Sequence, residues 1–349
     1  MPTKTDTMPA SGEVAAAELV AELMRQADEL ARTIPISCAY LTRLSRAQRG
    51  AGDAEGAAFS LAKARSLAVT APDGYSKEYA FRDVLDVQCE AGDWDGAKET
   101  AGAIPDVAVG LSCFVAIATA QTKKGDLGAA RQTLAIARDK ANAIPPEAKG
   151  KKTSVLLAIA KAQAASGDIG GALRTADDIA IEYGRNTALG VVIEAQLKTH
   201  DFAGAKQTAD RVAGVPYQVS MLRRIGVSES KAGQQEAAVD TLRTARQRAQ
   251  TVPKRKMALG EIVKTQIRIR DLAGARETAD AIPDDSLKAV CLCAVVEAYA
   301  DTGAFAEARA VLDTMPAGGT KARALAHLLC SLTSLTSLSH RNERGGLGG

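Results

Sequence analysis

The stretch Gly125-Asp126-Leu127-Gly128-Ala129-Ala130 decides the fold, because variants of it recur along most of the 349-residue chain. Each copy carries an alanine five residues after the turn glycine or its replacement: Ala57, Ala97, Ala130, Ala172, Ala205, Ala238, Ala275 and Ala308. Successive copies are 33 to 42 residues apart. Self-similarity at such a period is typical of stacked supersecondary units that cannot bury their apolar faces alone. The sequence therefore predicts eight repeats.

Each copy is predicted to form the corner of a helical hairpin. Glycine takes the left-handed conformation that ends a helix without a Cβ clash, and it occupies the turn in six repeats. His200 and Arg270 replace it in the other two, at some local cost. The next residue is usually aspartate, such as Asp126, whose carboxylate can accept a hydrogen bond from the start of the following helix.

The second helices of the hairpins are predicted to have two lengths. Three repeats have a proline twenty residues after the turn glycine, at Pro72, Pro145 and Pro253. Two others have it thirteen residues after the turn residue, at Pro105 and Pro283. Because proline cannot continue a helix and disfavours helix in the preceding residue, it sets where each second helix ends. The long spacings between repeats follow the long helices.

A second column lies four residues before each turn. Glutamine occupies it in six repeats, and Glu229 and Tyr299 occupy it in the other two. Two interpretations are open. The glutamines could hydrogen-bond a neighbouring repeat's backbone, which would satisfy partly buried polar groups. Alternatively, they could form a ladder of amides that lines a groove for an extended chain.

Composition limits the class of protein. The chain is 46% hydrophobic but only 3% aromatic, so its core must consist of small and aliphatic side chains, as suits stacked helices. A net charge of +3 gives no strong global attraction to nucleic acid or membranes. Six cysteines without paired metal spacing, and the absence of a signal peptide or a long apolar run, predict a soluble cytoplasmic protein with reduced thiols.

Little in the sequence indicates catalysis. The three histidines, His200, His327 and His340, have no spacing that suggests a metal site or a nucleophile pair. The glycines are explained by hairpin turns rather than by a phosphate-binding loop. We therefore expect a non-catalytic protein without a cofactor or metal.

The hairpins resemble the tetratricopeptide repeat family over about residues 12–338. The matching pattern is the turn glycine, an apolar residue two later, the alanine at five and an apolar residue at nine; Tyr299, Gly303, Phe305, Ala308 and Leu312 fit it best. The early tryptophan of that family is largely missing, and several repeats are longer than its usual length of about 34 residues. The resemblance implies an all-α fold, a right-handed α-solenoid of about eight antiparallel helical hairpins, in which first helices line a concave groove for peptides or partner proteins.

On this sequence the resemblance implies a mildly basic groove. Its cations would be Arg46, Arg49, Arg82, Lys123, Lys161, Lys198, Arg223, Lys231, Lys264 and Arg268, set against Asp86, Glu90, Glu194, Glu297 and Asp301. A functional groove of this kind would hold carboxylates or phosphates. The alternative is an ordinary solvated charged face, since exposed ion pairs contribute little.

These features predict a scaffold or adaptor that binds an acidic protein or peptide partner, with no membrane partner. The alternative is a single-stranded RNA-binding protein like the related pentatricopeptide family, with contacts from the basic loops 149–152 and 254–256; the scarcity of stacking aromatics argues against it. Self-assembly through exposed repeat ends is a third possibility.

The domain boundaries follow from the repeats. Residues 1–11 are predicted to be disordered, 12–35 to be the half-repeat that caps the stack, and the repeats to extend to about 319. A capping helix is predicted over 320–338, and a disordered tail over 339–349.

Overall fold

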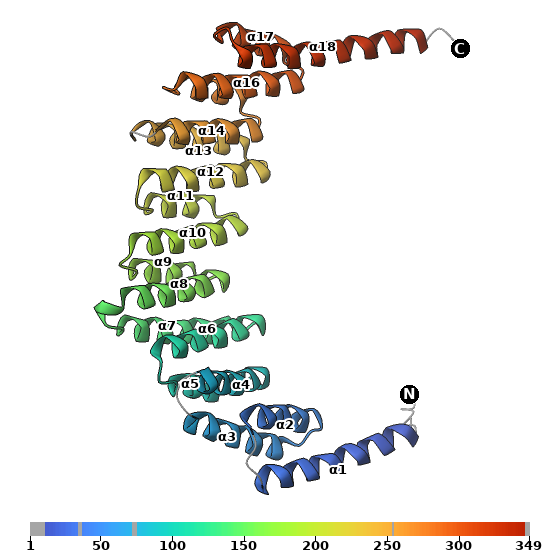
Figure 1. Cartoon of the computed structure of the whole chain (residues 1–349), viewed down its shortest axis with the longest axis vertical. Helices are drawn as coiled ribbons and strands as arrows, with labels where there is room; N and C mark the ends of the chain where they lie inside the picture. The colour runs from blue at the N-terminus through green and yellow to red at the C-terminus, as the bar shows by residue number, and fades with distance from the viewer. Residues whose placement is uncertain (1–10, 34–36, 72–74, 253–254, 346–349) are drawn as a thin grey trace, which may run out of the picture. The chain divides into compact units, whose positions relative to one another are not determined.

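The computed structural model describes residues 11–33, 37–71, 75–252 and 255–345. All regular secondary structure in these ranges is helical, with eighteen α-helices and one 3₁₀ turn (Figure 1). The helices pack as a repeat-like array, which confirms the predicted all-α class. The chain divides at Gly184 into two compact units, and each is described by itself.

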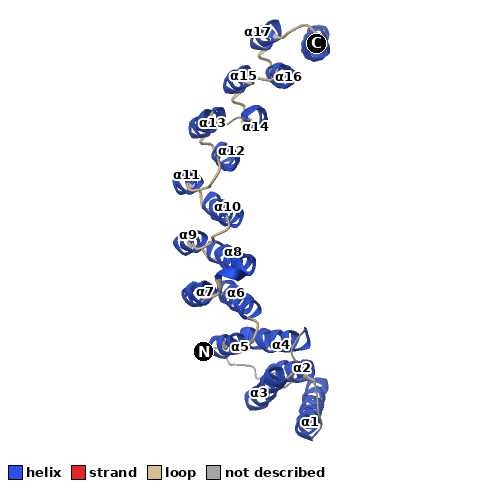
Figure 2. Cartoon of the chain, turned by 60° about the vertical axis from the view of Figure 1, so that its left-hand side comes forward, coloured by secondary structure: helices blue, strands red, loops and turns tan. Residues whose placement is uncertain are grey.

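The first unit contains α1, four hairpins and the connecting 3₁₀ turn. Its helices are α1 (Ser11–Thr33), α2 (Cys38–Gly50), α3 (Ala54–Thr70), α4 (Tyr75–Ala91), α5 (Trp94–Gly102), α6 (Val107–Lys123), α7 (Leu127–Asn142), η1 (Pro146–Ala148), α8 (Lys149–Ala165) and α9 (Ile169–Asp177). The even-numbered helices α2 to α8 form one layer and the odd-numbered helices α3 to α9 the other (Figure 2).

The second unit has the same organisation. Its helices are α10 (Glu182–Lys198), α11 (Phe202–Asp210), α12 (Val215–Lys231), α13 (Gln235–Gln250), α14 (Arg255–Arg268), α15 (Leu272–Asp280), α16 (Asp285–Asp301), α17 (Phe305–Thr314) and α18 (Gly319–Gly345). Here α10, α12, α14 and α16 are the first helices of hairpins, and α11, α13, α15 and α17 the second helices (Figure 2).

The corner chemistry predicted from the sequence is confirmed. All six turn glycines have φ between 78° and 83°, and His200 and Arg270 take the same left-handed conformation at 58° and 64°. Each of the six aspartates accepts a hydrogen bond of 2.9–3.0 Å from the backbone N–H three residues later, for instance Asp126 from Ala129. The same eight corners share a backbone bond from the residue after the turn to the carbonyl five residues earlier, as in Asp168 to Gln163 at 2.8 Å. This bond is the one that closes a glycine C-cap.

The two lengths of second helix are also confirmed. Helices α3, α7 and α13 have 16 or 17 residues, whereas α5, α9, α11 and α15 have 9 each. The alanine that marks each repeat is at most 5% exposed in every hairpin. The small side chain lies where the two helices of a hairpin meet, so a larger one would force them apart.

The chain ends differ from the predicted boundaries. Helix α18 does not stop at Leu338 but continues to Gly345, because residues 339–344 contain neither proline nor glycine to end it. The predicted tail of 339–349 is therefore helical over most of its length, and 346–349 lie outside the described residues. Of the predicted N-terminal segment 1–11, only Ser11 is described, as the first residue of α1.

The two basic tracts are helical rather than loops. Lys149 to Lys152 form the first turn of α8, directly after η1, and Arg255 and Lys256 begin α14, while Lys254 is outside the described residues. Cations at a helix start oppose the helix dipole. Three of them are paired: Lys152 donates to the Asn142 carbonyl at 3.1 Å, Lys256 donates to Asp284 at 2.8 Å, and Lys151 lies 3.9 Å from Asp106.

Candidate functional site

The glutamine column has a structural role within each hairpin. The six glutamine side chains are at most 3% exposed, so they line no groove. Gln196 shows the full arrangement: its Oε1 accepts from Thr208 on α11 at 2.9 Å, and its Nε2 donates to the capping Asp201 at 3.3 Å. The groove ladder predicted as one interpretation is therefore wrong, and the structural interpretation holds with different partners: they are side chains rather than backbone, and they lie in the same hairpin except for Asp28 of α1, which accepts from Gln48.

The threonine that completes this network also recurs, twelve residues after the column position. Thr133 donates to Gln121 at 2.9 Å, and Thr175 donates to Gln163 at 2.7 Å. Gln196 thus joins the end of its first helix to both the start and the middle of the second, whereas Gln88 and Gln266 make only the bond to the capping aspartate. Buried polar groups need such partners, so the network specifies how the two helices of a hairpin align.

One hairpin carries the same network with its charge moved. In the hairpin of α12 and α13, Glu229 replaces the glutamine and Gln234 replaces the capping aspartate. Thr241 still donates to the column residue, at 2.6 Å to Glu229. In each of the seven hairpins with a glutamine or glutamate in the column, the cap and column positions together therefore hold a single carboxylate.

A basic depression lies on the first-helix face of the second unit. It has a volume of about 340 Å³ and is lined by residues of α10, α12 and α14: Glu194, Leu197, Lys198, Arg224, Val227, Ser228, Lys231 and Arg268. Three of the ten cations predicted for a groove, Lys198, Lys231 and Arg268, meet here. We call this feature the basic depression.

The three cations occupy the same place in successive hairpins. Lys198, Lys231 and Arg268 each stand two residues before the turn, at the end of a first helix, and all three are exposed. None of them makes a hydrogen bond or ion pair with the part of the chain that the structure describes. Because they are unpaired and close together, their field adds in one place instead of being cancelled locally.

Arg224 is the fourth cation of the depression, and it forms an ion pair with Glu194 on α10. The sequence pattern predicted its neighbour Arg223 as a groove cation instead. A helical stripe could have identified it, since Arg224, Val227, Ser228 and Lys231 follow the spacing of one helix face. With four cations against one carboxylate, the depression has an excess of three positive charges around an apolar floor of Leu197 and Val227.

Four of the other predicted groove cations already have partners. Arg46 holds Glu90 with two bonds of 2.7 and 3.0 Å, and Arg49 donates to the Val87 carbonyl at 3.3 Å. In the second unit, Arg223 binds Glu261 and Thr265 at 2.9 and 2.8 Å, and Lys264 binds Glu261 at 2.8 Å. The hydrogen bond from Lys264 lowers the pKa of Glu261, as expected for a carboxylate between two cations.

The remaining three cations, Arg82, Lys123 and Lys161, are exposed on α4, α6 and α8 of the first unit. They stand ten, two and six residues before their turns, so Lys123 alone of the three has the repeat position of Lys198, Lys231 and Arg268. The structure therefore brings three of the ten predicted cations together in the basic depression.

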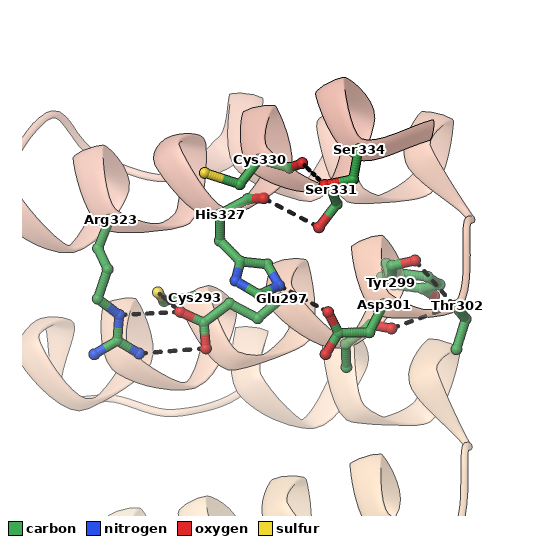
Figure 3. A network of polar contacts seen from close by, with 11 residues as sticks. Cys293, Glu297, Tyr299, Asp301, Thr302, Arg323, His327, Cys330, Ser331 and Ser334 are labelled. Atoms are coloured by element: carbon green, nitrogen blue, oxygen red, sulfur yellow. Dashed lines mark hydrogen bonds and ion pairs between the residues drawn. The ribbon is translucent and has the colours of Figure 1, made fainter. Parts of the chain in front are cut away.

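A second polar cluster joins α18 to α16 (Figure 3). Arg323 holds Glu297 with bonds of 3.0 and 3.4 Å, and His327 Nε2 lies 2.8 Å from Asp301. Cys293 donates to Glu297 at 3.4 Å, and burial, followed by this hydrogen bond, raises the pKa of its thiol. A reactive cysteine needs the opposite shift, so the cluster has the character of a helix contact.

Three other buried or half-buried thiols are similarly unreactive. Burial raises the pKa of Cys38, Cys89 and Cys113 to about 11 in each case. Cysteine reactivity requires the thiolate, so these side chains act as small apolar fillers. Among the described residues, no group of histidine, cysteine and acidic side chains has the arrangement of a metal site.

Comparison with known proteins gives no family. No family model matches the chain, and no curated protein matches it. Among solved structures, Ton1535 from Thermococcus onnurineus NA1 is 14% identical with a TM-score of 0.37, over 90% of this chain and 98% of that one. A circular tandem repeat protein is 13% identical with a TM-score of 0.22, over 95% and 87%. Both TM-scores are too low to carry an argument about fold or function.

Proposed function

We propose that this protein is a non-catalytic interaction scaffold, a divergent tetratricopeptide-like right-handed solenoid of about eight hairpins, that binds an acidic segment of a partner protein at the basic depression. The observation that carries the proposal is the set of unpaired cations Lys198, Lys231 and Arg268 at one repeat position in three successive hairpins. No cofactor takes part.

The arrangement suits an extended chain. A ligand that crosses α10, α12 and α14 meets one cation at the end of each first helix, in the order of the hairpins. Acidic side chains could pair with these cations, and Arg268 can hold a carboxylate with two parallel bonds. An apolar side chain of the ligand would cover Leu197 and Val227, which adds contact area that charge alone lacks.

The electrostatic cost of binding is low at this site. The three cations give up no internal partner when a ligand arrives, whereas Arg46 or Lys264 would have to leave a carboxylate. Each exposed ion pair contributes about 0.5 kcal/mol, so three together correspond to roughly tenfold in affinity. The ligand must therefore contact all three to be selected.

The lining favours a peptide over single-stranded RNA. Phosphates would also bind these cations, but proteins that bind single strands stack bases on aromatic side chains. None of the residues that line the basic depression is aromatic. An RNA ligand would be held by its backbone alone, without stacking.

The proposal is tested by fluorescence anisotropy with a short labelled peptide of aspartate, glutamate and leucine. Lys198→Ala/Lys231→Ala/Arg268→Ala should weaken binding about tenfold. Arg82→Ala/Lys123→Ala/Lys161→Ala is the matched control, since it removes the same charge from exposed positions of the first unit and should change affinity less than about twofold. Equal losses in both variants would show non-specific charge attraction and contradict the proposal.

A parallel titration with single-stranded oligouridine tests the alternative. Tighter binding of the oligonucleotide than of the acidic peptide, abolished by the first variant, would replace the peptide proposal with an RNA one.

A cytoplasmic location belongs to the same proposal, because all six cysteines are free thiols. None of the described helices has the length and apolar character required to cross a membrane.

A further inference from the structure

Helix α18 stacks on α16 as if it were the first helix of another hairpin. Arg323 pairs with Glu297 and His327 with Asp301, so both contacts join residues 26 positions apart and the two helices run parallel (Figure 3). First helices of successive hairpins are parallel in the same way: Lys256 at the start of α14 pairs with Asp284, the N-cap of α16, and Gly260 further along α14 lies against Leu287 and Cys291 further along α16. Ala324 and Leu328 of α18 are buried in this stack.

The face of α18 that a second helix would cover is open. Leu325, Leu329 and Leu332 are 45%, 52% and 37% exposed, at the spacing of one helix face. In a complete hairpin this kind of face is closed, as where Gly226 of α12 lies directly against Leu242 and Ala238 of α13. In α18 the helix continues where other first helices turn, so no described helix follows to cover these leucines.

Helix α1 is the complementary case. It precedes α2 in the way that each second helix precedes the next hairpin, and it is held there near its C-terminal end. Ala27 packs on the cluster that includes Leu41 and Leu44, and Gln48 donates to Asp28 at 2.5 Å. These contacts of α1 with the hairpin that follows lie in the C-terminal third of the helix.

The uncovered part of α1 is also apolar. Leu19, Val20 and Leu23 are 58%, 42% and 54% exposed, and Leu30 is 46% exposed. Leu19, Leu23 and Leu30 recur at helical spacing, which is the pattern of a helix that packs on another helix. Among the described helices, α1 is thus a second helix without a first helix, and α18 is a first helix without a second helix.

The charges of the two helices are opposite. By sequence, α1 carries five acidic and two basic residues, a net charge of −3. Helix α18 carries four basic residues and one acidic residue, a net charge of +3 with histidine neutral. Two copies of α1, or two copies of α18, would repel each other, whereas α1 and α18 attract.

We propose that the chain self-associates head to tail, with α1 of one copy packed antiparallel on α18 of the next and completing its hairpin. The two helices extend over about 35 and 40 Å at 1.5 Å per residue, so they match in length. Because the two surfaces are different, the contact is heterologous and each copy retains one free end of each kind. Longer assemblies form as concentration rises.

The experiment is analytical ultracentrifugation of the full chain over a range of concentrations. The wild type should show concentration-dependent species larger than a monomer, and added salt should shift them toward the monomer because opposite charges are screened. Leu19→Glu/Leu23→Glu alters only α1, and Leu325→Glu/Leu329→Glu alters only α18; each variant alone should be monomeric. Val107→Glu, at another exposed apolar position that is the first residue of α6, is the control and should associate like the wild type.

Mixing the two double variants separates this proposal from the alternatives and from misfolding. The α1 variant retains its α18 surface and the α18 variant retains its α1 surface, so the mixture should form a one-to-one dimer that does not grow. A monomeric wild type at all concentrations, or a mixture that stays monomeric while the wild type associates, would overturn the proposal. Association of the α1 variant alone would assign the contact to two α18 helices instead.

Discussion

Lys206 on α11 and Glu229 on α12 form an ion pair with 2.7 Å between Nζ and Oε1, although only 1% of the Glu229 side chain is exposed. The pair joins the second helix of one hairpin to the first helix of the next. Lys206 thus gives the carboxylate of Glu229 a counter-charge, at the column position that holds a neutral glutamine in six other hairpins. The exchange of Gln and Asp for Glu229 and Gln234 thus keeps one carboxylate per corner.

The single-carboxylate arrangement predicts the effect of adding a second one. In Gln196→Glu, a new carboxylate replaces the amide that donates to Asp201 at 3.3 Å, in a site that is 3% exposed. We expect a loss of about 2–4 kcal/mol in the free energy of unfolding, because like charges meet in a buried site. Urea denaturation followed by circular dichroism measures it.

The second substitution of this cycle tests the cause. Gln196→Glu/Asp201→Asn restores a single carboxylate at this corner, at the column position as in Glu229 but without a counterpart of Lys206, and asparagine remains a good N-cap. The part of the lost stability that comes from like-charge repulsion should return. If the double variant is as unstable as the single one, the loss comes from packing rather than charge.

Backbone strain at two corners predicts stabilising substitutions. Arg270 has φ of 64° where six other corners have glycine. A side chain in this conformation costs about 1–2 kcal/mol, so Arg270→Gly should stabilise the protein by about 1 kcal/mol. Arg270→Ala is the control: it removes the side chain but keeps the strain, and thermal denaturation should show little gain.

His200→Gly should give a smaller gain. Its φ of 58° is strained in the same way, but its ring also lies edge-on to Phe202 at 5.7 Å. An aromatic pair of this kind contributes about 0.5–1.5 kcal/mol, which offsets the relief of strain. A larger gain for His200→Gly than for Arg270→Gly would contradict this account.

The corners could be predicted from the sequence because each depends on neighbours in the chain. A left-handed turn, the cap of Asp126 and the stop at Pro105 act over a few residues, so their residue types are sufficient evidence. The role of Gln196 could not be assigned in the same way, because its partner Thr208 is on another helix. The recurring threonine was visible but its meaning depended on how the helices align.

The candidate site was predictable only in part. Lys198, Lys231 and Arg268 share a repeat position, which the sequence displays, but which cations are already neutralised depends on the stacking of helices. Arg46, for example, is neutralised by Glu90 on α4, whereas Lys231 has no such partner among the described residues. The predicted end of the last helix at Leu338 was wrong because the polar composition after Leu338 is also typical of disorder. No proline or glycine stands between Leu338 and Gly345, so the helix continues.

Releasing Arg224 should strengthen binding of the proposed acidic ligand. In Glu194→Gln the ion pair with Arg224 is lost, and the depression gains a fourth unpaired cation. One additional exposed pair with the ligand corresponds to about a twofold to fivefold gain in affinity, measured by anisotropy with the acidic peptide. Glu90→Gln, which releases Arg46 in the first unit, is the matched control and should leave the affinity unchanged. Equal gains in both variants would mean that only the net charge of the protein matters.

Acid sensitivity in the first unit should depend on Asp178. Its carboxylate accepts from Arg138 at 2.6 Å and from Asn142 at 3.0 Å, which connects the end of α9 to α7. Burial acts to raise the pKa of Asp178, but these two hydrogen bonds outweigh it and the pKa falls below its ordinary value of 3.8. A lowered folded pKa means that the stabilisation is fully present above pH 3.8 and is lost as the pH falls through the folded pKa. Asp178→Asn should therefore cost about 1 kcal/mol at neutral pH, and the difference from the wild type should disappear in acid.

Asp139→Asn removes an exposed aspartate of α7 that makes no such bond, and its unfolding free energy should follow that of the wild type at every pH. If Asp178→Asn remains less stable by the same amount at the lowest pH at which the wild type stays folded, the side chain acts through its shape rather than its charge, since both forms of the wild-type carboxyl would then support the contact equally.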